Sequence, residues 1–270
     1  MPGSGAIGRA LDRAIADRRG ALLPFLTSGF PDPEESIRLA LAACEEGADA
    51  LELGVPFSDP LADGPVIQET SRRALASGAT LEGALREARR IRERHETPIV
   101  LMTYVNPVVR LGAERFAREA AHAGVDGVIL VDLPPGEDPD LWNAMDRSGL
   151  DTITLVAPTT GPARLPAIAA RARGFLYVVA RLGVTGSGAT DPGLERLLAR
   201  CREHTPLPRC VGFGLGASSD LTRLRGLAEG VIVGSSLLSA ILAESDPSSR
   251  ERAARQFLRS MRARLPDLVG

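Results

Sequence analysis

Three carboxylates fall close together in the segment 51–65, which reads LELGVPFSDPLADGP. Glu52 interrupts a short apolar run, and Asp59 and Asp63 follow in a segment that begins at Pro56. A carboxyl group inside a buried strand costs several kcal/mol unless it is hydrogen-bonded or protonated. Glu52 is therefore predicted to serve chemistry, with Asp63 as its partner. The alternative is that Glu52 simply caps neighbouring backbone amides at the end of a strand.

The composition argues against several other kinds of catalytic site. Every basic residue except the three histidines is arginine, so no lysine exists to form a Schiff base, to hold pyridoxal phosphate or to complete a lysine-containing phosphate loop. His95, His122 and His204 precede strands or lie in helices, which argues against histidine catalysis and a histidine-bound metal. Glu52, Asp63 and Asp132 are oxygen ligands that suit Mg²⁺, but no dense acidic cluster supports such a site. We expect no cofactor and no metal.

The elements that must position these residues recur along the whole chain. Short apolar runs alternate with arginine- and glutamate-rich segments whose apolar residues are spaced three or four apart, as in 34–46, 81–96 and 114–123. This alternation predicts a parallel sheet buried on both faces, and about eight units in 270 residues favour a single (β/α)₈ TIM barrel over an open doubly wound sheet. The expected strands are 21–27, 50–55, 99–104, 127–132, 152–157, 175–180, 209–213 and 230–234.

No linker divides the chain, so we expect one domain over 1–270. Residues 1–20 are predicted to form an extra helix that covers the barrel bottom, 21–238 the barrel itself, and 239–270 a helical C-terminal segment. The net charge of −2 gives no electrostatic case for nucleic acid or a membrane surface. Three unclustered cysteines, no apolar run long enough to span a membrane, and no signal peptide favour a cytoplasmic protein.

The carboxyl ends of the strands are where such barrels keep their active sites. Glycine-rich runs follow the sixth, seventh and eighth expected strands, and glycines let backbone N–H groups approach an anion closely. A helix that begins at Ser235 would add its positive end. These loops predict a phosphate site. The residues at the strand ends are Phe25, Thr27, Glu52, Tyr104, Asn106, Asp132, Tyr177, Gly212, Gly214, Gly234 and Ser235.

Together these residues resemble the tryptophan synthase α-subunit family over about residues 19–238. The run 51–65 is the most specific match, and it is supported by Pro24-Phe25, Met102-Thr103-Tyr104, Asn106-Pro107, Asp132-Leu133-Pro134, Arg181, Gly183-Val184-Thr185-Gly186, Gly212-Phe213-Gly214 and Val233-Gly234-Ser235. The resemblance implies retro-aldol cleavage of indole-3-glycerol phosphate to indole and glyceraldehyde 3-phosphate. It also implies a pyridoxal-phosphate-dependent β subunit that receives the indole, in an αββα complex.

The resemblance assigns roles residue by residue. Glu52 is similar to the family's general acid/base, Asp63 to the carboxylate that faces the indole N–H, and Tyr177 to its active-site tyrosine. The remaining assignments are Phe25, Tyr104 and Ile129 in the indole pocket, Thr185 in the lid, Gly186, Gly214, Gly234 and Ser235 at the phosphate, and Asp59, Pro60 and Asn106 facing the partner. Glu52 is expected to have a raised pKa and Asp63 to remain charged.

Departures from the family pattern occur at Val105, Ala180 and Leu215, and they leave phosphate affinity and lid behaviour open. The alternative functions are a stand-alone lyase that releases indole, a non-catalytic paralogue that binds a phosphorylated ligand, and another phosphosugar enzyme on the same barrel. Asp59 and Asn106 can also be explained as residues that cap turns.

Overall fold

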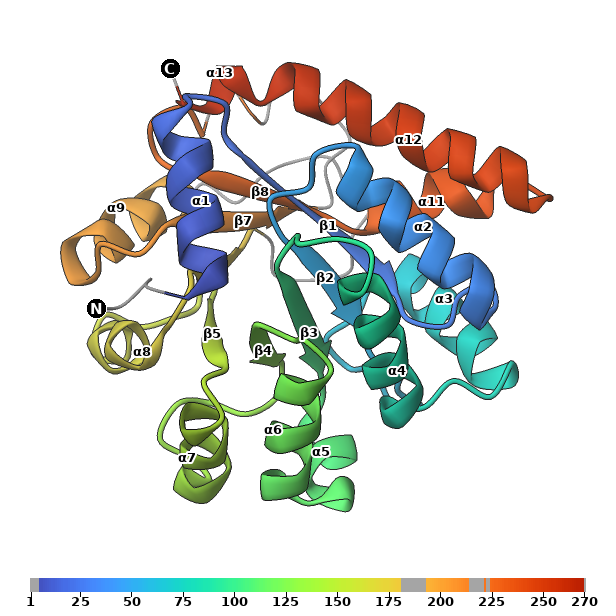
Figure 1. Cartoon of the computed structure of the whole chain (residues 1–270). Coiled ribbons are helices and arrows are strands. Elements are labelled where there is room, and N and C mark those ends of the chain that lie inside the picture. The colour runs from blue at the N-terminus through green and yellow to red at the C-terminus, as the bar shows by residue number, and fades with distance from the viewer. Residues whose placement is uncertain (1–4, 181–192, 214–220, 222–223, 270) are drawn as a thin grey trace.

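The computed structural model describes residues 5–180, 193–213, 221 and 224–269. Eight parallel strands close into a barrel in the order β1 to β8, with each strand paired to the next and β8 paired to β1 (Figure 1). The predicted TIM barrel is confirmed. The strands are β1 (Ala21–Thr27), β2 (Leu51–Gly54), β3 (Ile99–Thr103), β4 (Gly127–Leu130), β5 (Asp151–Val156), β6 (Leu176–Val179), β7 (Arg209–Phe213) and β8 (Gly230–Val233).

Helices surround this barrel, as the apolar spacing of the intervening segments predicts. Both α2 and α12 begin with an aspartate whose carboxylate accepts two backbone N–H groups, followed by a proline at the first helical position. The helices are α1 (Ala6–Ala16), α2 (Pro33–Glu45), α3 (Pro65–Ala76), α4 (Leu81–Arg92), α5 (Val105–Leu111), α6 (Ala113–His122), α7 (Pro139–Arg147), α8 (Leu165–Arg171), α9 (Leu194–His204), α11 (Ser235–Leu242), α12 (Pro247–Arg264) and α13 (Pro266–Val269).

Two local expectations are corrected. The helix expected over 81–96 ends at Arg92, and the chain turns there before β3. Asn106-Pro107, expected in a turn, lies within the first turn of α5. Proline is tolerated there because the first backbone N–H groups of a helix have no partner within the helix. The expected strands otherwise match the observed ones to within two residues at each end.

Helix α1 crosses the barrel at the amino ends of the strands (Figure 1). The buried side chain of Ile7 lies so close to Gly127, at the start of β4, that a Cβ there would come within 2.7 Å of its Cδ1 atom. Gly174, just before β6, is also near Ile7. The opposite, carboxyl-end face of the barrel is therefore the one that α1 leaves uncovered.

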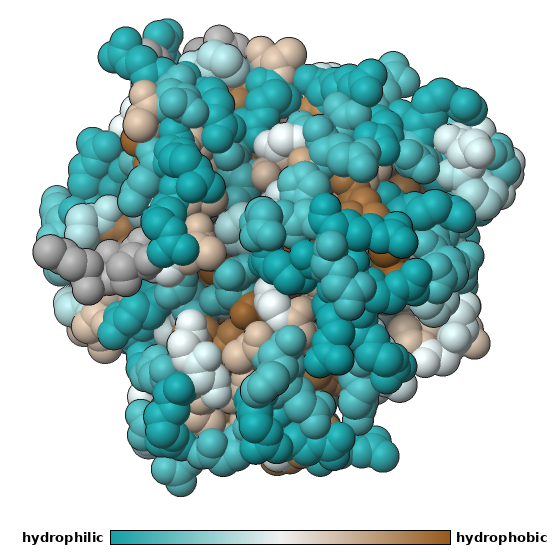
Figure 2. All heavy atoms as spheres, in the orientation of Figure 1, coloured by the Kyte–Doolittle hydropathy of each residue, from teal (hydrophilic) through white to brown (hydrophobic). Residues whose placement is uncertain are grey.

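The outer surface is mostly hydrophilic on the side where α1 lies, and hydrophobic residues there form small separated patches (Figure 2). The long helix α12 packs against α2 and α11 (Figure 1). Among the described residues, no helix has the length and apolar character needed to cross a membrane.

Candidate active site

Solvent reaches a few strand side chains near the carboxyl end of the barrel. Nearly all described strand side chains are buried; apart from Asp151 at the start of β5, five positions in β3, β5, β6 and β7 keep partial exposure. They lie near the carboxyl ends of their strands, where a parallel barrel keeps its active site. These positions are Met102, Leu155, Tyr177, Val179 and Gly212.

Glu52 lies in β2 beside this open end, and its side chain is fully buried. Its Cα is in register with Phe25 of β1 and Val100 of β3. Neither carboxylate oxygen has a hydrogen-bond partner among the described residues. Burial raises the pKa of Glu52 well above its ordinary value. The side chain therefore does not cap backbone amides in the described part of the chain, and its burial favours the protonated form, which can give a proton.

Asp63 lies in the loop between β2 and α3, next to the ring of Tyr104. Burial raises its pKa to about 6, and the neighbouring Tyr104 hydroxyl opposes that rise. The cause is the position of the loop, which folds back onto β3 and leaves Asp63 half-buried. Asp63 still remains largely ionised at neutral pH, as expected.

Tyr177 of β6 lies within electrostatic reach of both carboxylates. Its pKa is raised first by burial and then by the neighbouring carboxyl groups of Glu52 and Asp63. The ring occupies space that Gly212 of β7 leaves free, since a Cβ at Gly212 would lie 2.6 Å from the tyrosine hydroxyl oxygen. The structure therefore brings the three predicted catalytic residues to one end of the barrel.

Phe25 of β1 connects this group with the predicted phosphate site. A Cβ at Gly54 would lie 2.3 Å from Cζ of the Phe25 ring, and one at Gly234 would lie 3.3 Å from its Cβ. Gly54 thus makes room for the Phe25 ring and Gly212 for the Tyr177 ring, a role that the sequence analysis did not predict. The only signal for this role would have been that each glycine lies on the inward face of the strand next to its aromatic residue.

The expected helix at Ser235 is present as α11, which follows β8 directly. Gly234 precedes its first turn, and both Gly234 and Ser235 are partly exposed at the open end of the barrel. The positive end of α11 suits an anion there. Three predicted residues, Thr185, Gly186 and Gly214, lie outside the described residues.

Ile129 of β4 is fully buried, and its Cα is in register with Met102 and Ile153. Phe25 and Tyr104, the other residues predicted to line the indole pocket, are buried as well, at 5% and 6% exposure.

The residues predicted to face a partner lie on the same end of the molecule, outside the barrel. Asp59 and Asn106 are exposed and Pro60 is half-buried. Asp59 accepts a hydrogen bond from the Ser58 hydroxyl, as a turn residue would. Nearby, Leu61 is 97% exposed and Val109 on α5 is 59% exposed, and these are the exposed large hydrophobic side chains of the described residues.

The histidines lie away from this end, as predicted. His122 and His204 end helices α6 and α9, and His95 lies between α4 and β3. Within the described residues, no three histidine, cysteine or carboxylate side chains gather closely enough to hold a metal ion.

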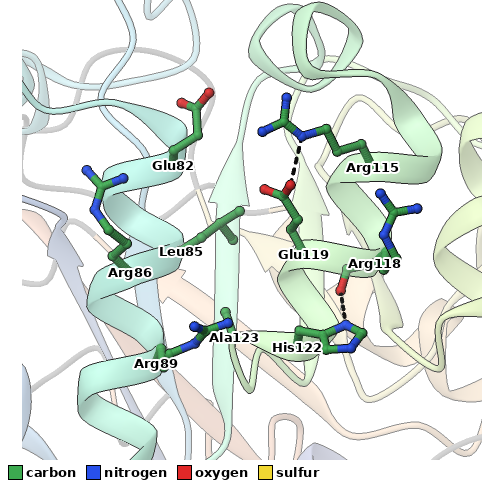
Figure 3. Close-up of a pocket in the computed structure, with 9 residues that line it drawn as sticks. All are labelled: Glu82, Leu85, Arg86, Arg89, Arg115, Arg118, Glu119, His122 and Ala123. Carbon is green, nitrogen blue, oxygen red and sulfur yellow. Dashed lines mark hydrogen bonds and ion pairs between the residues drawn. The ribbon is translucent and has the colours of Figure 1, made fainter.

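A groove of about 530 Å³ lies between α4 and α6 on the outer wall (Figure 3). Its residues are charged and exposed except for a floor that includes Leu85 and Ala123. Glu119 is paired with Arg115, and the His122 ring bonds the backbone oxygen of Arg118. Because its buried lining side chains are apolar, this groove holds no buried ionisable side chain comparable to Glu52.

The family model for the tryptophan synthase alpha chain matches residues 11–265. The chain belongs to the tryptophan synthase alpha chain family. Among curated members, the alpha chain of Alkalilimnicola ehrlichii is 47% identical over 254 residues, which is 93% of each chain. That of Desulfosudis oleivorans is 46% identical over 230 residues, covering 85% of this chain and 87% of the relative.

Solved structures of the tryptophan synthase alpha chain family agree with this assignment. A chain of tryptophan synthase from Mycobacterium tuberculosis superposes with a TM-score of 0.89 at 34% identity and covers 98% of each chain. Tryptophan synthase subunit alpha from Legionella pneumophila gives a TM-score of 0.86 at 37% identity and covers 97% of this chain and 98% of that one. The resemblance read from the sequence is confirmed along nearly the whole chain.

Proposed function

We propose that this chain is the α subunit of tryptophan synthase and cleaves indole-3-glycerol phosphate to indole and glyceraldehyde 3-phosphate. It acts as a carbon–carbon lyase in tryptophan biosynthesis, and its β subunit receives the indole. The observation that carries the chemistry is the pair of carboxylates at one end of the barrel, one fully buried with a pKa raised well above its ordinary value and the other half-buried with a pKa of about 6. Family membership favours this function over a stand-alone indole-releasing lyase.

The two carboxylates divide the work through their surroundings. Cleavage requires a proton at indole C3 and the removal of a proton from the side-chain hydroxyl next to the bond that breaks. Glu52 is suited to move these protons because burial in its apolar site favours the protonated form. Protonation of C3 makes the indole ring cationic, and the ionised Asp63 stabilises that charge at the ring N–H.

The other predicted residues are proposed to hold the substrate. Phe25 and Tyr104 lie beside the carboxylates and flank the indole ring, whereas Ile129 supports this wall from within the barrel. Tyr177 is within electrostatic reach of Glu52 and Asp63 and contributes to catalysis beside them. Gly234, Ser235 and the first turn of α11 receive the phosphate, together with Gly186 and Gly214, and Thr185 belongs to the lid.

Asp59, Pro60 and Asn106 are proposed to face the β subunit. The exposed side chains of Leu61 and Val109 lie on the same surface, and apolar side chains are typical of the buried core of a protein interface. We also propose a cytoplasmic location, for which the three free, buried cysteines are suited.

The direct test is indole formation from indole-3-glycerol phosphate by the purified chain, alone and with its β subunit. We expect slow turnover by the chain alone and a strong increase with the β subunit. Equal, rapid turnover in both conditions would instead support a stand-alone lyase. No indole in either condition from a folded sample would overturn the proposed reaction.

A further inference from the structure

The groove between α4 and α6 on the outer wall has arginines on both of its sides (Figure 3). Helix α4 contributes Arg86 and Arg89, and α6 contributes Arg115 and Arg118. All four side chains are exposed, so their guanidinium groups are available to a ligand. The volume of about 530 Å³ lies within the usual range of a cleft that binds a small molecule.

The carboxylates of α6 neutralise only part of this charge. Glu119 is paired with Arg115 at 2.7 Å. Glu114, one turn before Arg118, bonds Arg147 outside the groove instead. Arg118 therefore has no carboxylate partner among the described residues.

The α4 side of the groove has the same excess. Arg86 and Arg89 form no ion pair and no side-chain hydrogen bond within the part of the chain that the structure describes. Glu82, the other acidic residue of the lining, acts on Arg115 of the opposite helix. Four arginines thus stand against two glutamates in the groove. Arginine is not deprotonated in proteins, so the excess of positive charge persists at any ordinary pH.

We propose that this groove is a binding site for a small ligand that carries two or more phosphate groups. Guanidinium groups donate paired hydrogen bonds to phosphate oxygens. A phosphate ester carries a charge of about −1.5 to −2 at neutral pH, so two such groups balance three guanidinium groups on facing helices, whereas a carboxylate supplies one charge. The buried floor of Leu85 and Ala123 gives the ligand an apolar surface to contact. The site lies on the outer wall of the barrel and does not depend on the proposed lyase reaction.

The test is isothermal titration calorimetry of the full chain with inorganic tripolyphosphate at low ionic strength. Excess glycerol 3-phosphate is present throughout, so that the monophosphate site proposed at α11 is already occupied. We expect tripolyphosphate to bind about tenfold more tightly than either inorganic phosphate or citrate, because it joins several phosphate groups that reach both helices. Added salt should weaken the binding, because the charges involved are exposed.

Substitutions of single arginines locate the bound ion. Arg89→Gln and Arg118→Gln should each weaken binding by about fivefold or more, because each removes one charged donor from a different side of the groove. Arg252→Gln on α12 is the matched control, since it removes the same charge from an exposed arginine elsewhere and should leave the affinity unchanged. Both groove variants alter exposed side chains, and their melting temperatures verify that they are folded.

Four results would overturn this site. They are no binding of tripolyphosphate by the wild type, binding that glycerol 3-phosphate abolishes, equal losses in Arg89→Gln and Arg252→Gln, and citrate binding as tight as that of tripolyphosphate. The readout is binding rather than indole formation. A chain that binds tripolyphosphate in the groove but forms no indole with its β subunit would overturn the proposed function and leave this site standing.

Discussion

The Glu52 carboxyl group is buried without a hydrogen-bond partner among the described residues, and this arrangement destabilises the folded protein at neutral pH. Its pKa is raised on folding, so the folded state binds the proton more tightly than the unfolded state. The resulting loss of stability is absent below the unfolded pKa. It grows as the pH rises toward the folded pKa and is complete above it.

Glu52→Gln should therefore stabilise the fold while it removes the acid. A glutamine of nearly the same shape carries no charge, so the increase in melting temperature over the wild type should grow between about pH 4.5 and pH 8. Thermal unfolding followed across this range measures the difference. A variant less stable than the wild type at pH 8 would show that Glu52 has a partner that stabilises its charge.

Gly212 and Gly54 support the site because neither has a side chain, which leaves space for the rings of Tyr177 and Phe25. Gly212→Ala places a Cβ within 2.6 Å of the Tyr177 hydroxyl oxygen, and the flanking β7 backbone cannot yield. We expect kcat to fall at least tenfold with a smaller effect on unfolding, because the ring must move out of the open end of the barrel. Gly161→Ala is the control, since nothing lies within 4 Å of a Cβ there. Equal activity of the two variants would contradict this role.

For single residues, the sequence predicted which carboxylates lie at the site better than it predicted the contacts around them. An acid in an apolar strand is visible in the sequence, and so is the direction of its pKa. The pKa of Asp63 was not predictable, because it depends on a contact between Tyr104 and a loop forty residues earlier in the chain. The space that Gly212 provides for Tyr177 is likewise set by the pairing of β6 with β7.

Among the elements, α12 is joined to α2 by an ion pair that is buried on one side. Arg250 Nη1 lies 3.0 Å from both Glu35 oxygens, and the Glu35 side chain is only 2% exposed. A buried charge that loses its partner is strongly destabilising. The C-terminal helix therefore contributes to the stability of the barrel wall.

Arg250→Ala should lower the free energy of unfolding by about 3 kcal/mol because it leaves Glu35 buried without this partner. Chemical denaturation of the isolated chain measures this change. Arg252→Ala on the same helix is the matched control, since its side chain is exposed and bonds only the Ser249 hydroxyl among the described residues. A comparable loss of unfolding free energy in both variants would show that the Arg250–Glu35 ion pair does not stabilise the fold more than the exposed Arg252 contact does.

The element pattern itself was largely predictable, because each strand is a continuous apolar run and each helix has an apolar stripe. Element ends were predicted less well. The chain turns after Arg92, and Asn106-Pro107 enters a helix, because local capping and packing decide such boundaries. The role of α1 against Gly127 depends on tertiary contacts that periodicity does not reveal.

For the whole molecule, the closed barrel brings the catalytic carboxylates and the surface that we propose for the β subunit to the same end. Val109→Glu should raise the concentration of β subunit needed for half-maximal stimulation by at least tenfold, because a charge would be buried at the interface. Titration of the chain with the β subunit measures this shift. Arg118→Glu on the outer groove of Figure 3 should leave it unchanged. If Val109→Glu required the same concentration of β subunit as the wild type, α5 would not be part of the interface.

The central claim is that Glu52 transfers the protons when the bond to indole C3 breaks. The most direct measurement is the rate of indole formation from indole-3-glycerol phosphate by Glu52→Gln with saturating β subunit. Loss of a general acid/base predicts a fall in kcat of at least about 100-fold in a variant that is folded and still binds the β subunit. A rate close to that of the wild type would contradict the account.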